Sequence, residues 1–184
     1  EELPHFVDAL TTNKSGFFRE PAHFEYLSRM VLPALERTER PIRLWSAGCA
    51  AGEEPYTLAM VMRDTLSSRT LARTRILATD ISHRVLSVAR EARYSATHRD
   101  GVPAEQLARH FDPTPGADGT RQVNVSTRDL VRFAWLNLID DWPMRGPFDV
   151  ILCRNVMICF DRPTQQRLVE RLGALLTPGG VLCV

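Results

Sequence analysis

The sequence has almost no lysine and no excess of charge of either sign. Lys14 is the single lysine among 23 basic residues, and 22 acidic residues bring the formal net charge to +1. A protein that grips nucleic acid through its phosphates needs a basic excess or a basic stripe. We therefore expect no nucleic-acid partner. Arginine forks can recognise carboxylates or phosphates, but compositional bias explains the arginines more simply.

Cysteine and histidine are scarce and form no metal-binding motif. Cys49, Cys153, Cys159 and Cys183 contain no CxxC pair, and the five histidines show no HxxxH or HExxH spacing. These patterns predict no metal site and four reduced, buried cysteines in a reducing compartment. A signal peptide and a long apolar run are also missing from the sequence. We therefore expect a cytoplasmic protein that does not insert into a membrane.

Strand-like and helix-like segments alternate along most of the 184 residues. The expected strands cover residues 42–47, 75–80, 131–136, 148–153 and 181–184. The expected helices cover residues 21–40, 53–66, 82–94 and 163–176, with a kink at Pro33, an N-cap at Ser82 and a turn at 177–180. Strands separated by helices of this length predict an α/β fold with a parallel sheet.

Residues 95–128 interrupt this alternation. They contain a helix-like stretch at 104–111, a Pro/Gly-rich run at 112–120 and a strand-like stretch at 122–126. The segment is longer than an ordinary crossover loop, so we interpret it as a small insert on the main sheet.

The turn after the first expected strand consists of small residues from Ala47 to Gly52. Small residues let the backbone approach a ligand, and this turn is the usual nucleotide site of an open parallel sheet. The GxGxxG fingerprint is absent, and Glu53 and Glu54 at the helix start would repel a pyrophosphate. This argues against a nicotinamide oxidoreductase and favours a cationic, phosphate-free ligand such as S-adenosylmethionine (SAM). A capped tight turn without a ligand is the alternative.

Polar residues follow the other strands. Asp80 ends the second strand, Asn137 follows the third, and Arg154 and Asn155 follow the fourth. These positions share the carboxyl edge of the sheet, where ligands of such folds bind. Asp80 could accept hydrogen bonds from ribose hydroxyls or cap a helix, and Asn137 could contact an adenine edge or cap a turn.

Four phrases together resemble the chemotaxis receptor methyltransferases, the CheR family. They are TTNKSGFFRE at 11–20, WSAGCAAGEEPY at 45–56, ATDI at 78–81 and CRNVMICFD at 153–161. The resemblance implies a SAM-dependent enzyme that methylates glutamate side chains of chemoreceptors. It also implies a Rossmann-like class I methyltransferase sheet, with helices on both faces and a small β-subdomain insert where residues 95–128 lie.

The resemblance also implies site residues and boundaries. The candidate cofactor site comprises Asn13, Ser15, Arg19, Ala47, Gly48, Glu53, Asp80, Asn137, Leu138, Arg154 and Asn155. Asp80 would hold the ribose, Arg19 or Glu53 the methionine end, and Asn137 with Leu138 the adenine, while Arg154 and Asn155 would border the acceptor. Arg19 could instead pair with a surface glutamate.

Residues 1–20 would form a linker and cofactor-contacting loop, and residues 21–184 the catalytic domain, without its N-terminal helical domain or last strands. Cys159 stands where the family usually has tyrosine, and Ser15 where it commonly has threonine.

A glutamate acceptor is already an anion at pH 7, so methyl transfer needs alignment and desolvation rather than a general base. The expected partner is a chemoreceptor cytoplasmic domain. A receptor tail peptide could add to the edge strand of the insert, and an exposed edge at 181–184 could allow a dimer. A methyltransferase with another acceptor and a non-catalytic, cofactor-sensing module remain alternatives.

Overall fold

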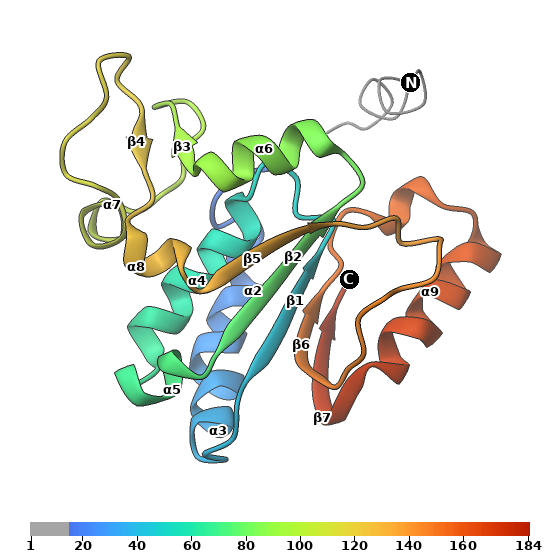
Figure 1. Cartoon of the computed structure of the whole chain (residues 1–184). Coiled ribbons are helices and arrows are strands. Elements are labelled where there is room, and N and C mark those ends of the chain that lie inside the picture. Colours follow the sequence, from blue (N-terminus) through green and yellow to red (C-terminus); the bar gives the residue numbers. More distant parts are fainter. Residues whose placement is uncertain (1–14) are drawn as a thin grey trace.

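A five-stranded parallel sheet forms the centre of the protein in the computed structural model, which describes residues 15–184 (Figure 1). The strand order is β5-β2-β1-β6-β7. The strands are β1 (Arg43–Ala47), β2 (Arg75–Asp80), β5 (Val131–Trp135), β6 (Phe148–Leu152) and β7 (Leu176–Cys183). Every neighbouring pair in this sheet is parallel, so the predicted α/β class is confirmed.

Helices cover both faces of the sheet. They are α2 (Pro21–Tyr26), α3 (Leu32–Glu36), α4 (Glu53–Thr65), α5 (Ser68–Ala72), α6 (His83–Glu91), α7 (Ala104–His110), α8 (Val125–Arg128) and α9 (Arg162–Ala174). Adjacent residues of β1 point to opposite faces, as the pleat requires. Leu44 packs in one core cluster with Met62 of α4, and Trp45 packs in another with Leu172 of α9. Figure 1 shows α4 and α9 on opposite sides of the strands.

The first expected helix, over 21–40, forms in three parts and ends at Glu36. A π-helical stretch, η1 (Leu27–Val31), separates α2 from α3, in which Pro33 is the second residue. Because proline has no N–H and its ring crowds the preceding turn, a wider turn at this point lets the helix continue through Pro33. The helix ends at Glu36, earlier than the predicted end at residue 40, and the kink expected at Pro33 stays a prediction.

Two predictions in and near the insert are corrected. The helix expected to reach residue 94 ends at Glu91, because Ala92 has a left-handed φ of 52° and β3 (Arg93–Tyr94) follows. The strand expected over 122–126 is wrong in its second half. The strand β4 covers Arg121–Gln122, and the Asn124 side chain then accepts a hydrogen bond from the Thr127 N–H and caps α8. Figure 1 shows β3, β4 and α7 gathered beside α4, away from the main sheet.

The turn expected at 177–180 lies inside the strand β7. Phe148 pairs with Leu176 and Val150 with Val181, so β7 has extra residues opposite a short stretch of β6. Gly179, with a φ of 77°, belongs to this irregular stretch. The Thr-Pro-Gly-Gly sequence therefore bulges the edge strand instead of separating it from α9.

Three of the four cysteines are buried, as expected, but Cys159 is exposed, so the prediction of four buried thiols is wrong. Cys159 ends a short 3-10 helix, η2 (Met157–Cys159), which packs less deeply than the strands. Within residues 15–184, no helix combines the length and apolar character needed to cross a membrane.

Candidate functional site

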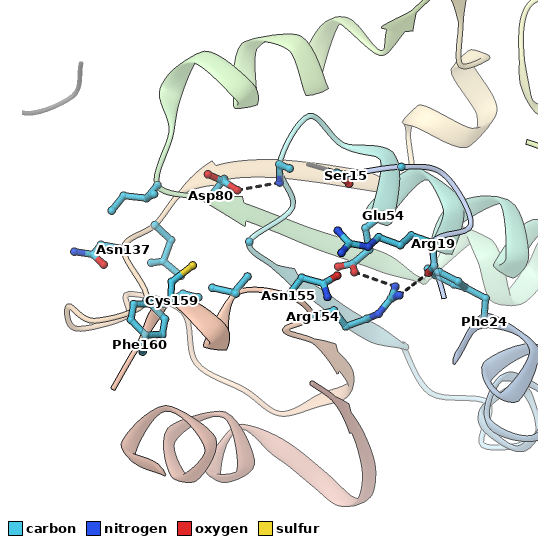
Figure 2. A pocket seen from close by; sticks show the side chains of 17 residues that line it. Ser15, Arg19, Phe24, Glu54, Asp80, Asn137, Arg154, Asn155, Cys159 and Phe160 are labelled. Atoms are coloured by element: carbon cyan, nitrogen blue, oxygen red, sulfur yellow. Dashed lines mark hydrogen bonds and ion pairs between the residues drawn. The ribbon is translucent and has the colours of Figure 1, made fainter. Parts of the chain in front are cut away.

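A cavity of about 280 Å³ lies at the carboxyl ends of the strands (Figure 2). Its walls include the predicted site residues Ser15, Arg19, Gly48, Asp80, Asn137, Leu138, Arg154 and Asn155. Two other predicted residues, Ala47 and Glu53, are buried but do not line it. Asn13 lies outside the described residues. Figure 2 shows Asn137 and Phe160 toward one end of the cavity, and Arg19, Glu54 and Arg154 toward the other.

Backbone hydrogen bonds hold the small-residue loop after β1 across the end of β2. The N–H groups of Gly48 and Cys49 both donate to the carbonyl of Thr79, at 2.8 and 2.9 Å. Gly48 and Gly52 have left-handed φ values of 84° and 96°, which favour glycine. The loop therefore owes its shape to two glycines and to the neighbouring strand, and Gly48 and Ala50 line the cavity.

Asp80 is the polar centre of this edge. It ends β2 and is 8% exposed. One carboxylate oxygen accepts a hydrogen bond from the Ala50 N–H at 2.9 Å, and the other accepts one from the Ser82 N–H at 2.9 Å. Asp80 thus joins the loop after β1 to the start of α6 and also lines the cavity. The predicted N-cap at Ser82 is confirmed, because its hydroxyl oxygen accepts from the Val85 N–H.

The two adjacent glutamates at the start of α4 have different surroundings. Glu54 lines the cavity; it accepts a hydrogen bond from the Ser46 hydroxyl at 2.7 Å and one from Arg154 Nη1 at 3.2 Å. Burial raises the pKa of the Glu54 carboxyl, and these two partners oppose the rise. Burial also raises the pKa of Glu53, opposed by its own backbone N–H and by Ser15. Sequence reasoning selected Glu53 and missed Glu54.

Arg154 is buried, although the sequence suggested a place beside the acceptor. Its Nη2 donates to the Arg19 carbonyl at 2.5 Å and lies 3.1 Å from a carboxylate oxygen of Glu20. Its guanidinium carbon lies 5.2 Å from the centre of the Phe24 ring. Arg154 therefore links the end of β6 to the segment that precedes α2.

Asn155 and Asn137 lie at the rim. Asn155 has a left-handed φ of 57°, is exposed, and donates to Glu20 at 3.3 Å. Asn137 accepts a hydrogen bond from the Ile139 N–H at 3.1 Å, which is the turn-capping role considered from the sequence.

The remaining lining residues were not selected as site residues from the sequence, although all but Phe24 and Leu136 lie within the four family phrases. They are Gly16, Phe24, Ala50, Ile81, Leu136, Val156, Cys159 and Phe160, most of them apolar. Apolar residues near the strand ends have no sequence pattern that distinguishes cavity walls from the core. Cys159 carried a family-level signal, because it replaces a tyrosine in the CRNVMICFD phrase. Among residues 15–184, no group of three or more His, Cys, Asp or Glu side chains is placed to hold a metal ion.

A parallel sheet, a small-residue loop after β1 and an acidic tip on the adjacent β2 define a Rossmann-like ligand-binding domain. Over residues 13–184 the chain matches the family described as CheR methyltransferase, SAM binding domain. The chain belongs to this family, so the resemblance found in the sequence is confirmed.

Curated relatives match this chain over nearly its whole length. The chain is 43% identical over 178 residues to Chemotaxis protein methyltransferase 2 of Pseudomonas aeruginosa, covering 96% of this chain and 63% of the relative. It is 40% identical over 183 residues to Chemotaxis protein methyltransferase of Escherichia coli, covering 98% of this chain and 62% of the relative. The chain thus spans somewhat less than two thirds of the length of these relatives. A solved structure of PKMT2 from Rickettsia typhi in complex with AdoHcy aligns with a TM-score of 0.48 at 16% identity, covering 78% of this chain and 20% of that chain.

Proposed function

We propose that this chain is the catalytic domain of a cytoplasmic enzyme that uses SAM to methylate glutamate side-chain carboxylates of chemoreceptors. Membership of the CheR SAM-binding family supports the cofactor, and the names of the curated relatives support chemotaxis. The observation that carries the proposal is the Asp80 carboxylate, fixed beside the small-residue loop in a cavity at the carboxyl edge of the sheet.

The lining of the cavity fits SAM better than a phosphorylated nucleotide. Its charged residues are two arginines and two carboxylates, Arg19, Arg154, Glu54 and Asp80. Arg154 already contacts Glu20 and Glu54, so it is poorly placed to bind a phosphate. SAM combines an apolar adenosine surface with a sulfonium, an ammonium and a carboxylate. Apolar walls with a few balanced charges suit such a ligand.

We assign the parts of the ligand as follows. Asp80 accepts hydrogen bonds from the ribose hydroxyls, and Asn137 with Leu138 borders the adenine. Ser15 and Arg19 serve the methionine end, together with Asn13. The loop after β1 contains Gly48 and is bounded by Ala47 and Glu53. We propose that these three residues shape the path of the loop.

When bound, SAM supplies a methyl group whose carbon–sulfur bond breaks, leaving the electron pair on sulfur, as the acceptor oxygen forms the ester bond. The chain need not remove a proton, because a glutamate with an ordinary pKa of about 4.3 is ionised at pH 7. The residues of the chain hold the ligand and keep water out of the cavity. Asn155, exposed at the rim, borders the acceptor. Alignment of this kind can supply several kcal/mol of the barrier reduction.

Two further partners are proposed. A receptor tail peptide could add as a strand to the small β3–β4 sheet. The Asp112 N–H already donates to the Gln122 carbonyl on the outer edge of β4, so we propose β3 as the pairing strand. β7 is an edge of the main sheet, so pairing between two copies is a second proposal.

The test uses SAM with a tritiated methyl group and membranes that contain chemoreceptors. We expect label on the receptor, released as volatile methanol by mild base because a carboxyl methyl ester is base-labile. Receptors with glutamine at the methylated glutamates are the control and should stay unlabelled. Base-stable label, or label on another macromolecule, would favour the alternative acceptor. Binding of S-adenosylhomocysteine (SAH) without transfer to any receptor would favour a non-catalytic, cofactor-sensing module.

A further inference from the structure

We infer that Arg154 is a positioning residue that fastens the segment before α2 to the sheet edge, with Glu20 and Glu54 as its two counterions. We call the group Glu20, Glu54 and Arg154 the latch. The existence of the latch rests on the contacts of Arg154 with Glu20, Glu54 and the Arg19 carbonyl. Its effect on cofactor binding rests on the proposed function.

The latch joins three separate parts of the chain. Arg154 follows β6, Glu54 lies in the first turn of α4, and Glu20 is the N-cap of α2. Arg154 Nη1 contacts Glu54 at 3.2 Å, and Nη2 contacts Glu20 at 3.1 Å as well as the Arg19 carbonyl. Figure 2 shows the Arg154 guanidinium between Glu54 and Arg19. One side chain therefore fixes both the backbone of Arg19 and the side chain of Glu20.

The burial of Arg154 makes these contacts important. Arg154 is 5% exposed, and a buried guanidinium is costly unless its hydrogen-bonding groups are satisfied. Glu54 supplies a buried carboxylate, itself held by Ser46. Glu20, at 43% side-chain exposure, is the outer partner. The hydrogen bonds from Arg154 and Asn155 lower the pKa of Glu20, so Glu20 stays ionised at neutral pH.

The segment held by the latch, residues 15–20, forms neither helix nor strand. Phe18 and Glu20 have left-handed φ values of 54° and 55°, which are unfavourable for residues with side chains. One outside contact is the Phe18 N–H, which donates to the Thr57 hydroxyl at 3.1 Å. The latch supplies a second set of contacts two residues later. With the buried Phe17 ring, which packs on Tyr94 and Phe111, these contacts help to place Arg19 at the cavity wall.

These contacts replace the acceptor-side role expected for Arg154. Its side chain is 3% exposed, although it forms part of the cavity wall. Both terminal nitrogens already contact carboxylates of this chain. Arg154 therefore acts through Arg19 and Glu20 and not on the methyl acceptor.

The test compares Glu20→Ala with the matched control Glu25→Ala. Glu25 is an exposed glutamate of the same helix, α2, and does not line the cavity. Glu20→Ala is preferred to a change at Arg154, because removing Arg154 would leave Glu54 buried without its counterion and could unfold the chain. Glu20→Asp serves as the conservative variant, since it keeps the charge on a shorter side chain.

Two measurements are needed. Hydrogen–deuterium exchange of residues 16–24 should be faster in Glu20→Ala than in the wild type and in Glu25→Ala, with intermediate exchange in Glu20→Asp. Calorimetry should show SAH binding to Glu20→Ala weakened about two- to fivefold, as expected from loss of one partly exposed charged contact. In receptor methylation, KM for SAM should rise while kcat changes little.

The outcomes separate the two proposals. Equal exchange in Glu20→Ala and the wild type would overturn the latch, whatever the cofactor. Faster exchange with unchanged SAH affinity would overturn its positioning role. A wild type that does not bind SAH would instead remove the proposed function, and the exchange data would still decide whether the latch exists.

Discussion

Gly48 lies so close to Val156 that an added Cβ would stand 2.3 Å from the Val156 Cγ2 atom. The first residue belongs to the loop after β1 and the second to the chain that follows β6. Both line the cavity. Two neighbouring strands therefore place their loops in direct contact at the wall of the site, with no room for a side chain between them.

Gly48→Ala should lower the free energy of unfolding by about 2–5 kcal/mol. Overpacking against Val156 contributes about 1–3 kcal/mol, and a non-glycine residue at a φ of 84° adds about 1–2 kcal/mol. Urea denaturation measures the loss. Adding Val156→Ala should recover part of it, because the clash disappears while the backbone strain stays. Gly173→Ala is the control: an added Cβ there meets nothing within 4 Å, and alanine favours the α9 helix. Equal stability of the single and double variants would show that Val156 is not the cause.

Asp80→Ala should weaken SAH binding about ten- to hundredfold in calorimetry, the usual size of a lost charged hydrogen-bond acceptor. The loss has two sources, the ligand contact and the freed N–H groups of Ala50 and Ser82. Asp80→Asn should lie between alanine and the wild type, because an amide oxygen can serve only one of these donors while its NH₂ opposes the other. Asp100→Ala, an exposed residue in the insert, should bind normally. Unchanged affinity in Asp80→Ala would remove Asp80 from the site.

The sequence predicted the sheet and the edge where the cavity lies, because both depend on local patterns. Polar residues stand at or just after the strand ends, as Asp80 does at the end of β2 and Asn137 does after β5, and parallel strands bring such ends together. Local patterns could not show that Glu54 lines the cavity and that Glu53 does not. Adjacent helical residues point about 100° apart, and the rotation of α4 over the sheet is set by long-range packing.

Other errors have equally specific causes. Val125 looked like part of a strand, but the Asn124 side chain caps a helical turn there. The Thr-Pro-Gly-Gly sequence looked like a turn between two elements, but pairing with β6 keeps it within β7. In both places a tertiary or side-chain contact outweighed the propensity of the local sequence.

Two buried tyrosines offer a matched comparison. The Tyr94 hydroxyl donates to the Ala51 carbonyl in the loop after β1 at 2.7 Å, and the Tyr56 hydroxyl donates to the Ala89 carbonyl in α6 at 2.8 Å. Each change to phenylalanine should cost about 1–2 kcal/mol of unfolding free energy. Only Tyr94→Phe should also weaken SAH binding, by about two- to fivefold, because only the Tyr94 hydroxyl bonds to the loop. Equal SAH affinity in the two variants would mean that this hydrogen bond does not shape the site.

Cys159 should be the one thiol that iodoacetamide modifies rapidly in the native protein. It is exposed and lines the cavity. Cys49, Cys153 and Cys183 are buried, and burial raises the pKa of each, to about 12 for Cys153, which suppresses the reactive thiolate. SAH at ten times its Kd should slow the reaction about elevenfold. Mass spectrometry locates the label, and Cys159→Ser is the control. Fast labelling that SAH does not slow would place Cys159 outside the bound ligand's footprint.

His110 should make the stability of the fold depend on pH between about 7 and 5. It is 2% exposed and lies between the Thr127 hydroxyl, at 3.2 Å, and the Asp64 carboxylate, at 3.3 Å, where the insert meets α4. Burial lowers the pKa of His110, and the Asp64 charge only partly opposes this. The folded state therefore resists a proton that the unfolded chain accepts near pH 6.5. Because the unfolded state binds more protons in this range, stability should fall as the pH decreases.

Urea denaturation at pH 7 and pH 5 tests the role of His110. The stability difference between the wild type and His110→Asn should shrink as the pH falls, since asparagine does not titrate. His98→Asn is the control, because His98 is exposed and bonds only locally to Ser95. Hydrogen bonds from Gln106 and Arg109, and the charge of His110, lower the pKa of Asp64 against the raising effect of burial. Asp64 therefore titrates below this window. A pH-independent difference between wild type and His110→Asn would mean that His110 takes up its proton equally in both states.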